Sequence, residues 1–194
     1  MPQRGTSRRV LDDTERREIL SRLLSPATGQ LQYRVAVMFM VLLGQSFTAV
    51  AILRLDDVVI EDGGVGVRLG KGSTPVPPPF GAMVEELLTR RPNLNTAVNP
   101  TSPWLFPGQT ALNHLSPGTF GKLAGRMGIH LVGARTGALR QLVLDCPPPV
   151  VADMLGYGYK SMDRHAVRAG SPWSSYAAMR AGGAFPTARM EDRR

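Results

Sequence analysis

The chain has 194 residues and a net charge of +8, and 20 of its 23 basic residues are arginine. This length suffices for one domain with a hydrophobic core, and the charge suits a polyanionic partner such as nucleic acid, although a solvated basic surface explains it equally well. The single cysteine, Cys146, excludes an internal disulfide and a four-cysteine zinc site, and the three histidines show no metal-ligand spacing, so we expect no metal, no cofactor and no small-molecule substrate.

The N-terminal part of the chain is predicted to be helical after a short tail. Residues 1–9 form a basic, flexible tail with no apolar run directly behind it, which excludes a signal peptide and favours a cytoplasmic, nucleoid-associated location. Residues 12–14 offer helix caps, and apolar residues at helical spacing follow up to Leu24. Residues 25–30, which contain a proline and a glycine, end this helix.

The apolar stretch over residues 35–53 could be a membrane span or a buried element. Its length just suffices to cross a bilayer, but a glycine and three polar residues interrupt it between positions 44 and 48. We therefore predict two buried helices, at residues 31–43 and 47–53, and no membrane partner.

The pattern changes to that of a β-hairpin after residue 57. Residues 58–60 and 65–69 are rich in β-branched side chains, and the Asp62-Gly63 pair between them is typical of a tight turn. Residues 74–77 are predicted as a third strand, which the prolines confine to an edge.

Helical patterns dominate the rest of the chain. Apolar spacing, prolines in first turns and closing glycines predict helices at residues 80–91, 116–127, 135–144, 150–155, 161–168 and 172–180. We therefore predict an α+β, mainly helical fold with a small antiparallel sheet at about residues 57–77 between helices. One domain is expected over residues 10–182, with a C-terminal tail over residues 183–194.

Two signatures carry a resemblance to a known family. The first signature covers residues 42–58 and is followed by the hairpin and Gly70-Lys71-Gly72. The second signature runs from Arg135 through Leu139-Arg140 to Met154-Leu155-Gly156-Tyr157. The segment Trp104-Leu105-Phe106-Pro107 lies between the two. In this order the segments resemble the catalytic domain of tyrosine recombinases of the phage-integrase type, across about residues 10–170. The ending, Trp173-Ser174-Ser175-Tyr176-Ala177-Ala178, is most similar to divergent integrase-like proteins of actinobacteria.

The resemblance implies a defined chemistry. In this family a tyrosine hydroxyl attacks the scissile phosphate of double-stranded DNA, and two arginines hold the non-bridging oxygens as planar bidentate donors. A lysine on the hairpin turn acts as general acid toward the leaving 5′ oxygen. A histidine in a His-x-x-Arg motif and a second histidine, or a tryptophan, after Leu-Gly assist proton transfer.

The chain retains only part of this set. Lys71 occupies the lysine position and Arg135 the second arginine position. The first arginine position falls on Ser46 and the nucleophile position on Ala166. The histidine of the His-x-x-Arg motif falls on Val132, and the second histidine falls on Tyr157. The resemblance thus implies a DNA-binding protein whose cleavage and rejoining of DNA is lost or strongly impaired; if active, it would be a site-specific DNA recombinase acting by phosphotyrosyl transesterification.

Other tyrosines are weak replacements for the nucleophile. Tyr176 is the best placed, but together with Trp173 it also fits a packing role on one face of the last helix. Tyr157 and Tyr159 flank a glycine and are interpreted as surface or DNA-facing, and His165 as a surface histidine without a partner.

Three functional hypotheses remain open. As a recombinase relative, the protein is expected to contact DNA through Lys71, Arg135, Arg140, Lys160, Arg164 and Arg168. Alternatively, residues 150–167 resemble a helix-turn-helix reader of a regulator or accessory factor, with Lys160, Ser161, Arg164 and Arg168 facing DNA. The third hypothesis is an oligomeric interaction protein that uses residues 35–53 and 173–176.

The resemblance carries two further expectations about assembly. Recombinases commonly exchange a C-terminal helix between protomers, so homo-oligomerisation is implied by the resemblance alone. They also normally carry an N-terminal core-binding domain, and since only about ten residues precede the similar region, none is expected here.

Overall fold

Helices build most of the protein, as the sequence predicts. The computed structural model describes residues 10–61, 63–92, 101–110 and 112–175. Its α-helices are α1 (Asp13–Leu24), α2 (Leu31–Leu43), α3 (Phe47–Ala51), α4 (Pro78–Thr89), α5 (Pro117–Arg126), α6 (Leu131–Asp145), α7 (Pro148–Leu155) and α8 (Tyr159–Ala169). The strands are β1 (Val58–Glu61), β2 (Gly64–Arg68) and β3 (Ser73–Pro75), and 3-10 turns lie at η1 (Pro26–Thr28), η2 (Leu55–Asp57) and η3 (Pro172–Ser175).

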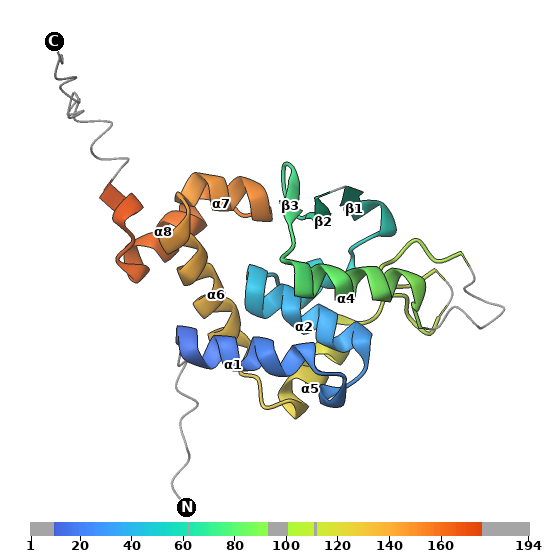
Figure 1. Ribbon diagram of the computed structural model, residues 1–194. Helices are drawn as coiled ribbons and strands as arrows, with labels where there is room; N and C mark the ends of the chain where they lie inside the picture. The colour runs from blue at the N-terminus through green and yellow to red at the C-terminus, as the bar shows by residue number, and fades with distance from the viewer. Residues whose placement is uncertain (1–9, 62, 93–100, 111, 176–194) are drawn as a thin grey trace, which may run out of the picture.

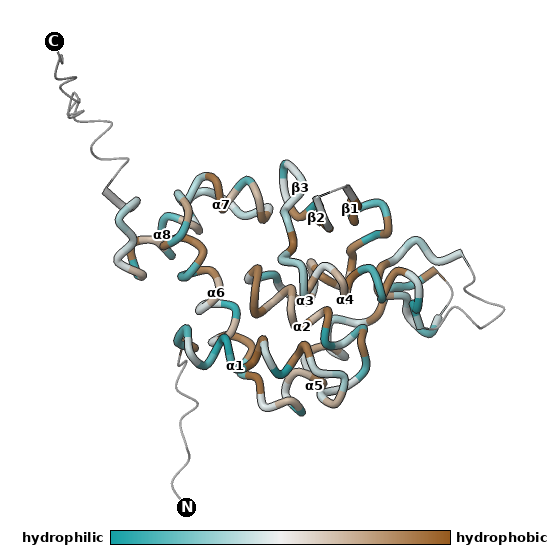
Figure 2. The backbone as a smooth tube through the Cα atoms, viewed as in Figure 1, coloured by the Kyte–Doolittle hydropathy of each residue, from teal (hydrophilic) through white to brown (hydrophobic). Residues whose placement is uncertain are grey.

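Helix α2 lies at the centre of the molecule. Ten of its thirteen residues are buried, and α1, α4, α5 and α6 pack around it. Figure 2 shows α2 in the interior with hydrophobic residues along it. The buried Arg34 donates from Nη1 to the carbonyl oxygens of Leu23 and Leu24, at 2.9 and 3.0 Å, and so caps the end of α1. The apolar stretch is therefore a core helix, and among the described residues no helix is long and apolar enough to cross a membrane.

Helix ends follow the capping residues of the sequence. Asp12 accepts a hydrogen bond from the backbone of Glu15, and the Glu15 side chain accepts one from the backbone of Asp12, which forms a capping box at the start of α1. Gly44 ends α2 in the left-handed conformation, with φ of 65°. Helix α6 begins four residues before its predicted start because the His130 side chain accepts a hydrogen bond from the Gly133 backbone, at 3.1 Å.

The sheet forms an antiparallel meander in the order β1-β2-β3. Val58 pairs with Val67 and Glu61 with Gly64, so the predicted tight turn joins the first two strands. The third strand begins one residue before its predicted start and ends two residues before its predicted end, and Pro75 lies opposite Gly66 at the sheet edge. Helix α4 packs against β2, and Phe80 of this helix meets Phe39 of α2 edge to face.

The last predicted helix is only partly described. Residues 172–175 form the 3-10 turn η3, and residues 176–180 lie outside the described residues. Trp173 donates from its indole nitrogen to the Leu144 carbonyl at 3.3 Å, so η3 packs at the end of α6.

The β2–β3 turn lies directly against the end of α7. The backbone nitrogen of Lys71 donates to the Asp153 carbonyl at 2.8 Å, and the Thr74 hydroxyl donates to the Met154 carbonyl at 2.7 Å. A Cβ atom on Gly70 would lie only 2.0 Å from the Asp153 carbonyl oxygen and 2.5 Å from the Gly156 nitrogen. Glycine at position 70 is therefore what lets these two backbones meet.

This contact predicts different effects of alanine at two positions of one turn. Gly70→Ala should lower the free energy of unfolding by about 2 kcal/mol or more, because the methyl group has to displace backbone atoms. Gly72→Ala is the matched control, since a Cβ there meets nothing within 4 Å and should change stability by less than about 0.5 kcal/mol. Urea unfolding measures both, and equal midpoints would contradict the close approach.

Candidate functional site

Arg135 joins three parts of the chain through one carbonyl group. Its Nε donates to the carbonyl oxygen of Gly44 at 3.0 Å, and its Nη2 donates to the Tyr157 hydroxyl at 3.1 Å. The Tyr157 hydroxyl in turn donates to the same Gly44 carbonyl at 2.6 Å. The end of α2, the first half of α6 and the turn after α7 therefore meet at this partly buried guanidinium group. The predicted surface-facing Tyr157 instead points its hydroxyl group inward.

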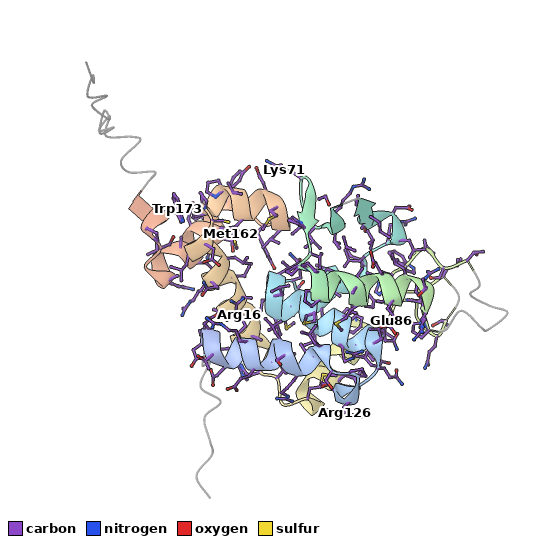
Figure 3. All side chains as sticks on the ribbon, in the orientation of Figure 1. Arg16, Lys71, Glu86, Arg126, Met162 and Trp173 are labelled. Atoms are coloured by element: carbon purple, nitrogen blue, oxygen red, sulfur yellow. The ribbon has the colours of Figure 1, made fainter. Side chains whose placement is uncertain are left out.

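Lys71 forms a second, more exposed cluster on the hairpin turn. Its Nζ lies 2.7 Å from the Tyr159 hydroxyl and 2.8 Å from Oδ1 of Asp153, and the Tyr159 hydroxyl donates to the same carboxylate at 2.6 Å. The lysine side chain is 70% exposed. Figure 3 shows Lys71 on the hairpin beside α7.

The charges of this cluster stabilise each other. The hydrogen bond from Lys71, followed by that from Tyr159, lowers the pKa of Asp153 below its ordinary value of 3.8. The hydrogen bond with Asp153, followed by that with Tyr159, raises the pKa of Lys71 above its ordinary value of 10.5. Lys71 thus stays protonated at neutral pH, and a nearby carboxylate balances its charge. A raised pKa also makes this lysine a poorer proton donor to a leaving group.

One short turn between α7 and α8 connects the two clusters. Tyr157, which contacts Arg135, and Tyr159, which contacts Lys71, flank Gly158. The buried Gln45 holds the start of this turn, because its Nε2 donates a hydrogen bond to the Leu155 carbonyl oxygen at 3.1 Å. The structure thus brings both cations to one turn, through contacts that spacing along the sequence does not reveal.

A third group, which we call the α6–α8 cluster, combines three of the predicted DNA-binding residues with a histidine: Arg140, Arg164, His165 and Arg168. Lys160, Arg164 and Arg168 are exposed on α8, whereas Arg140 of α6 and His165 are partly buried. Burial first, and then the charges of Arg140, Arg135, Arg168 and Arg164, lower the pKa of His165 below its ordinary value of 6.5. Burial and the nearby arginines thus disfavour the protonated form of His165, which is partly buried rather than a plain surface histidine.

The part of the chain that the structure describes contains no set of side chains suited to bind a metal ion. No group of three His, Cys, Asp or Glu side chains there could hold a metal ion. The carboxylate of Asp153 is hydrogen-bonded to Lys71 and Tyr159 instead.

Comparison with solved structures identifies the fold. No family model matches the sequence, and no curated protein matches it. Similar structures include the XerH site-specific recombinase bound to palindromic difH substrate in a post-cleavage complex, with a TM-score of 0.62 at 16% identity over 88% of this chain and 52% of that one. The pre-cleavage complex of XerH with difH gives a TM-score of 0.61 at 17% identity over 84% of this chain and 53% of that one. XerA recombinase gives a TM-score of 0.59 at 15% identity over 95% of this chain and 66% of that one.

The protein has a tyrosine-recombinase-like fold. The prediction of the fold from motif order is thereby confirmed, including the small sheet between helices. The chain spans about half of the length of XerH and 66% of XerA.

The positions at which the sequence departs from the residues expected by resemblance lie in different surroundings. The Ser46 hydroxyl caps α3 by accepting from the Ala49 backbone at 3.2 Å. Ala166, at the expected nucleophile position, is 1% exposed and packs in the core, whereas Val132 is 57% exposed. Tyr176, the weak candidate nucleophile, lies outside the described residues.

The contact between Arg135 and Tyr157 can be tested by comparing Tyr157 with Tyr159, the tyrosine on the other side of Gly158. Tyr157→Phe removes a hydroxyl group that donates to Gly44 and accepts from Arg135, so it should lower the free energy of unfolding by about 1–2 kcal/mol. Tyr159→Phe removes an exposed hydroxyl group and should change it by less than about 0.5 kcal/mol. Urea unfolding of the two variants compares them, and a larger loss in Tyr159→Phe would contradict the assignment.

The Lys71–Asp153 pair predicts a pH dependence. The Asp153 pKa is depressed by folding, so its stabilising contribution is present above pH 3.8 and is lost as pH falls through the lower pKa of the folded state. NMR titration of the Asp153 carboxyl carbon should therefore give a midpoint below 3.8, and Lys71→Met should raise that midpoint. The same midpoint in both proteins would show that the pair is not formed in solution.

Proposed function

We propose that the protein binds double-stranded DNA on a recombinase scaffold and that its cleavage and rejoining of DNA is lost or strongly impaired. The single observation behind this proposal is the contrast at the site. The two positions expected to bind phosphate, Arg135 and Lys71, carry cations beside one turn, while the expected nucleophile position holds the buried Ala166.

The surface charges support DNA as the partner. Lys160, Arg164 and Arg168 expose three cations on α8, and Lys71 exposes a fourth on the hairpin. Arginine suits phosphate because its planar donors bind two oxygens together. Among the similar structures, the two XerH complexes carry difH substrate, on a fold that this chain shares.

The chemistry of the replaced positions supports the loss of cleavage. Alanine has no hydroxyl group to attack phosphorus, and serine at position 46 offers one uncharged donor where an arginine would offer a charged bidentate one. Loss of one preorganised donor costs about two to three orders of magnitude in rate. Loss of the nucleophile removes the covalent step itself, and such effects within one catalytic unit do not add.

Binding is tested by fluorescence anisotropy with a labelled duplex at several salt concentrations. We expect an affinity that falls with log salt at a slope steeper than about −3, because each phosphate contact releases about 0.9 counterion. Arg135→Ala and Arg164→Ala should both weaken binding. No binding at low salt would reject this proposal and leave the oligomeric interaction protein.

Cleavage is tested on nicked suicide duplexes, in which a covalent protein–DNA adduct would accumulate. We expect no adduct with the unaltered protein. An adduct that disappears in Tyr176→Phe would overturn the proposed loss of activity and assign that tyrosine as nucleophile. An adduct lost in Tyr159→Phe would assign it instead to the hydroxyl group beside Lys71.

The helix-turn-helix hypothesis also has a specific observation in its favour. Helices α7 and α8 pack together across Gly156, which adopts a left-handed conformation with φ of 75°, and Lys160, Arg164 and Arg168 are exposed on the second helix. This alternative predicts that Arg164→Ala abolishes sequence preference while Arg135→Ala leaves binding intact. Homo-oligomerisation through the C-terminal helix stays a prediction, since residues 176–194 lie outside the described part of the chain.

A further inference from the structure

The α6–α8 cluster gathers positive charge without a matching negative charge. Arg164 and Arg168 lie one residue before and three residues after His165 on α8, and Arg140 belongs to α6, which packs along α8. Within the described ranges, neither these arginines nor Arg135 form an ion pair with an aspartate or glutamate. This differs from Lys71, whose charge a carboxylate balances. Like charges held together in this way favour an added anion.

Two buried nitrogen atoms of the cluster lack a hydrogen-bond partner among the described residues. They are Nε of Arg140 and Nδ1 of His165. A buried polar atom left unpaired costs about 1–3 kcal/mol. Guanidinium groups only donate, so the partner that Arg140 needs is an acceptor.

A hollow of about 370 Å³ opens beside this cluster, where the start of α1 meets α6 and the end of α8. Arg140, Arg168 and Arg16 border it. Asp12 and Asp13 also line it, but each already accepts hydrogen bonds. Asp12 caps α1, and Asp13 pairs with Arg16 and Arg17. Arg140 and Arg168 thus remain available to a molecule that enters the hollow, and Arg164 and His165 lie next to Arg168 on α8.

We propose that Arg140, Arg164, His165 and Arg168 form a binding site for a tetrahedral oxyanion, either a backbone phosphate of DNA or a free phosphate ion. This site does not use Lys71 or the contacts of Arg135 with Gly44 and Tyr157. The sequence predicts Arg140, Arg164 and Arg168 only as general DNA contacts, and the proposal adds His165, the hollow and the coupling to protonation. Its DNA form rests on the proposed function, whereas its free-anion form does not.

The site couples anion binding to the charge of His165. An oxyanion among the arginines offsets the positive charges that oppose protonation of this histidine, so the pKa of His165 rises on binding. Binding therefore takes up a proton and strengthens as pH falls through the His165 pKa. Helices α6 and α7 pack against α8, and their charged residues are Arg135, Arg140 and Asp145 of α6 and Asp153 of α7. The start of α1 borders the hollow and adds Asp12, Asp13 and Arg16. Helix α8 itself adds Lys160, Asp163, Arg164 and Arg168, and η3 adds no charged residue.

NMR of the histidine rings tests the site directly in the full chain. Sodium sulfate is the probe, because sulfate is tetrahedral and does not titrate near neutral pH; sodium chloride at equal ionic strength is the control. We expect sulfate to shift the His165 ring signals and raise its pKa, while His114 and His130 stay unchanged as internal references. Inorganic phosphate should act in the same way as sulfate. Unchanged His165 signals with both anions would overturn the site, whether or not the protein binds DNA.

Matched charge variants then separate the two sources of phosphate. Arg140→Gln and Arg168→Gln should each abolish the sulfate response. Because Arg168 is exposed, its variant still tests the site if replacement of the partly buried Arg140 disturbs folding. Arg126→Gln is the control, because this exposed arginine lies on α5, away from α8 (Figure 3). If DNA uses the site, Arg168→Gln lowers duplex affinity about fivefold to tenfold and reduces the salt slope by about one, while Arg126→Gln has a smaller effect.

The outcomes distinguish this inference from the proposed function. A sulfate response with equal DNA affinities for Arg168→Gln and Arg126→Gln assigns the site to a free anion. A sulfate response in a protein that binds no DNA supports the site and rejects the proposed function. DNA binding without any His165 response rejects the site and leaves the proposed function standing.

Discussion

The carbonyl oxygen of Gly44 is the acceptor on which the site depends. It receives hydrogen bonds from Arg135 of α6 and from Tyr157 in the turn after α7, and it is exposed to them because Gly44 ends α2 in a left-handed conformation. The central core helix thereby fixes the position of the α7–α8 turn. Tyr159 follows this turn directly, and its hydroxyl group contacts Lys71, so the turn also helps to position Lys71 on the hairpin. A residue with a side chain at position 44 would meet Leu139 at 2.5 Å, so both the conformation and the packing require glycine there.

Much of the fold could be predicted from the sequence, because its signals are local. The Asp12 cap, the proline in the first turn of α5 and the Asp62-Gly63 pair of the sequence set element ends within a few residues. The start of α6 was placed too late, since histidine is an unusual cap and His130 gives no clear signal. The third strand differs from its predicted range because its limits depend on backbone pairing with Gly66, Val67 and Arg68 of β2 rather than on its own residues.

The site was predictable only where a family motif marks a position. Arg135 and Lys71 could be named, but their partners could not. Asp153 and Tyr159 lie more than eighty residues after Lys71, and only the folded hairpin brings them together. The arginine cluster around His165 was predicted as separate DNA contacts on α8; its link to Arg140 depends on how α6 packs along α8.

The distribution of charge gives the retained residues different roles. Lys71 sits in a balanced pair, so its net attraction for phosphate is reduced by the carboxylate of Asp153. Arg135 divides its donors between a backbone carbonyl and a tyrosine hydroxyl, which fixes its orientation but leaves fewer donors for a ligand. The arginines on α8 carry no such carboxylate partner among the described residues. Long-range attraction depends on uncompensated charge, so in this protein α8 and the facing part of α6 contribute more of it than Lys71 and Arg135 do.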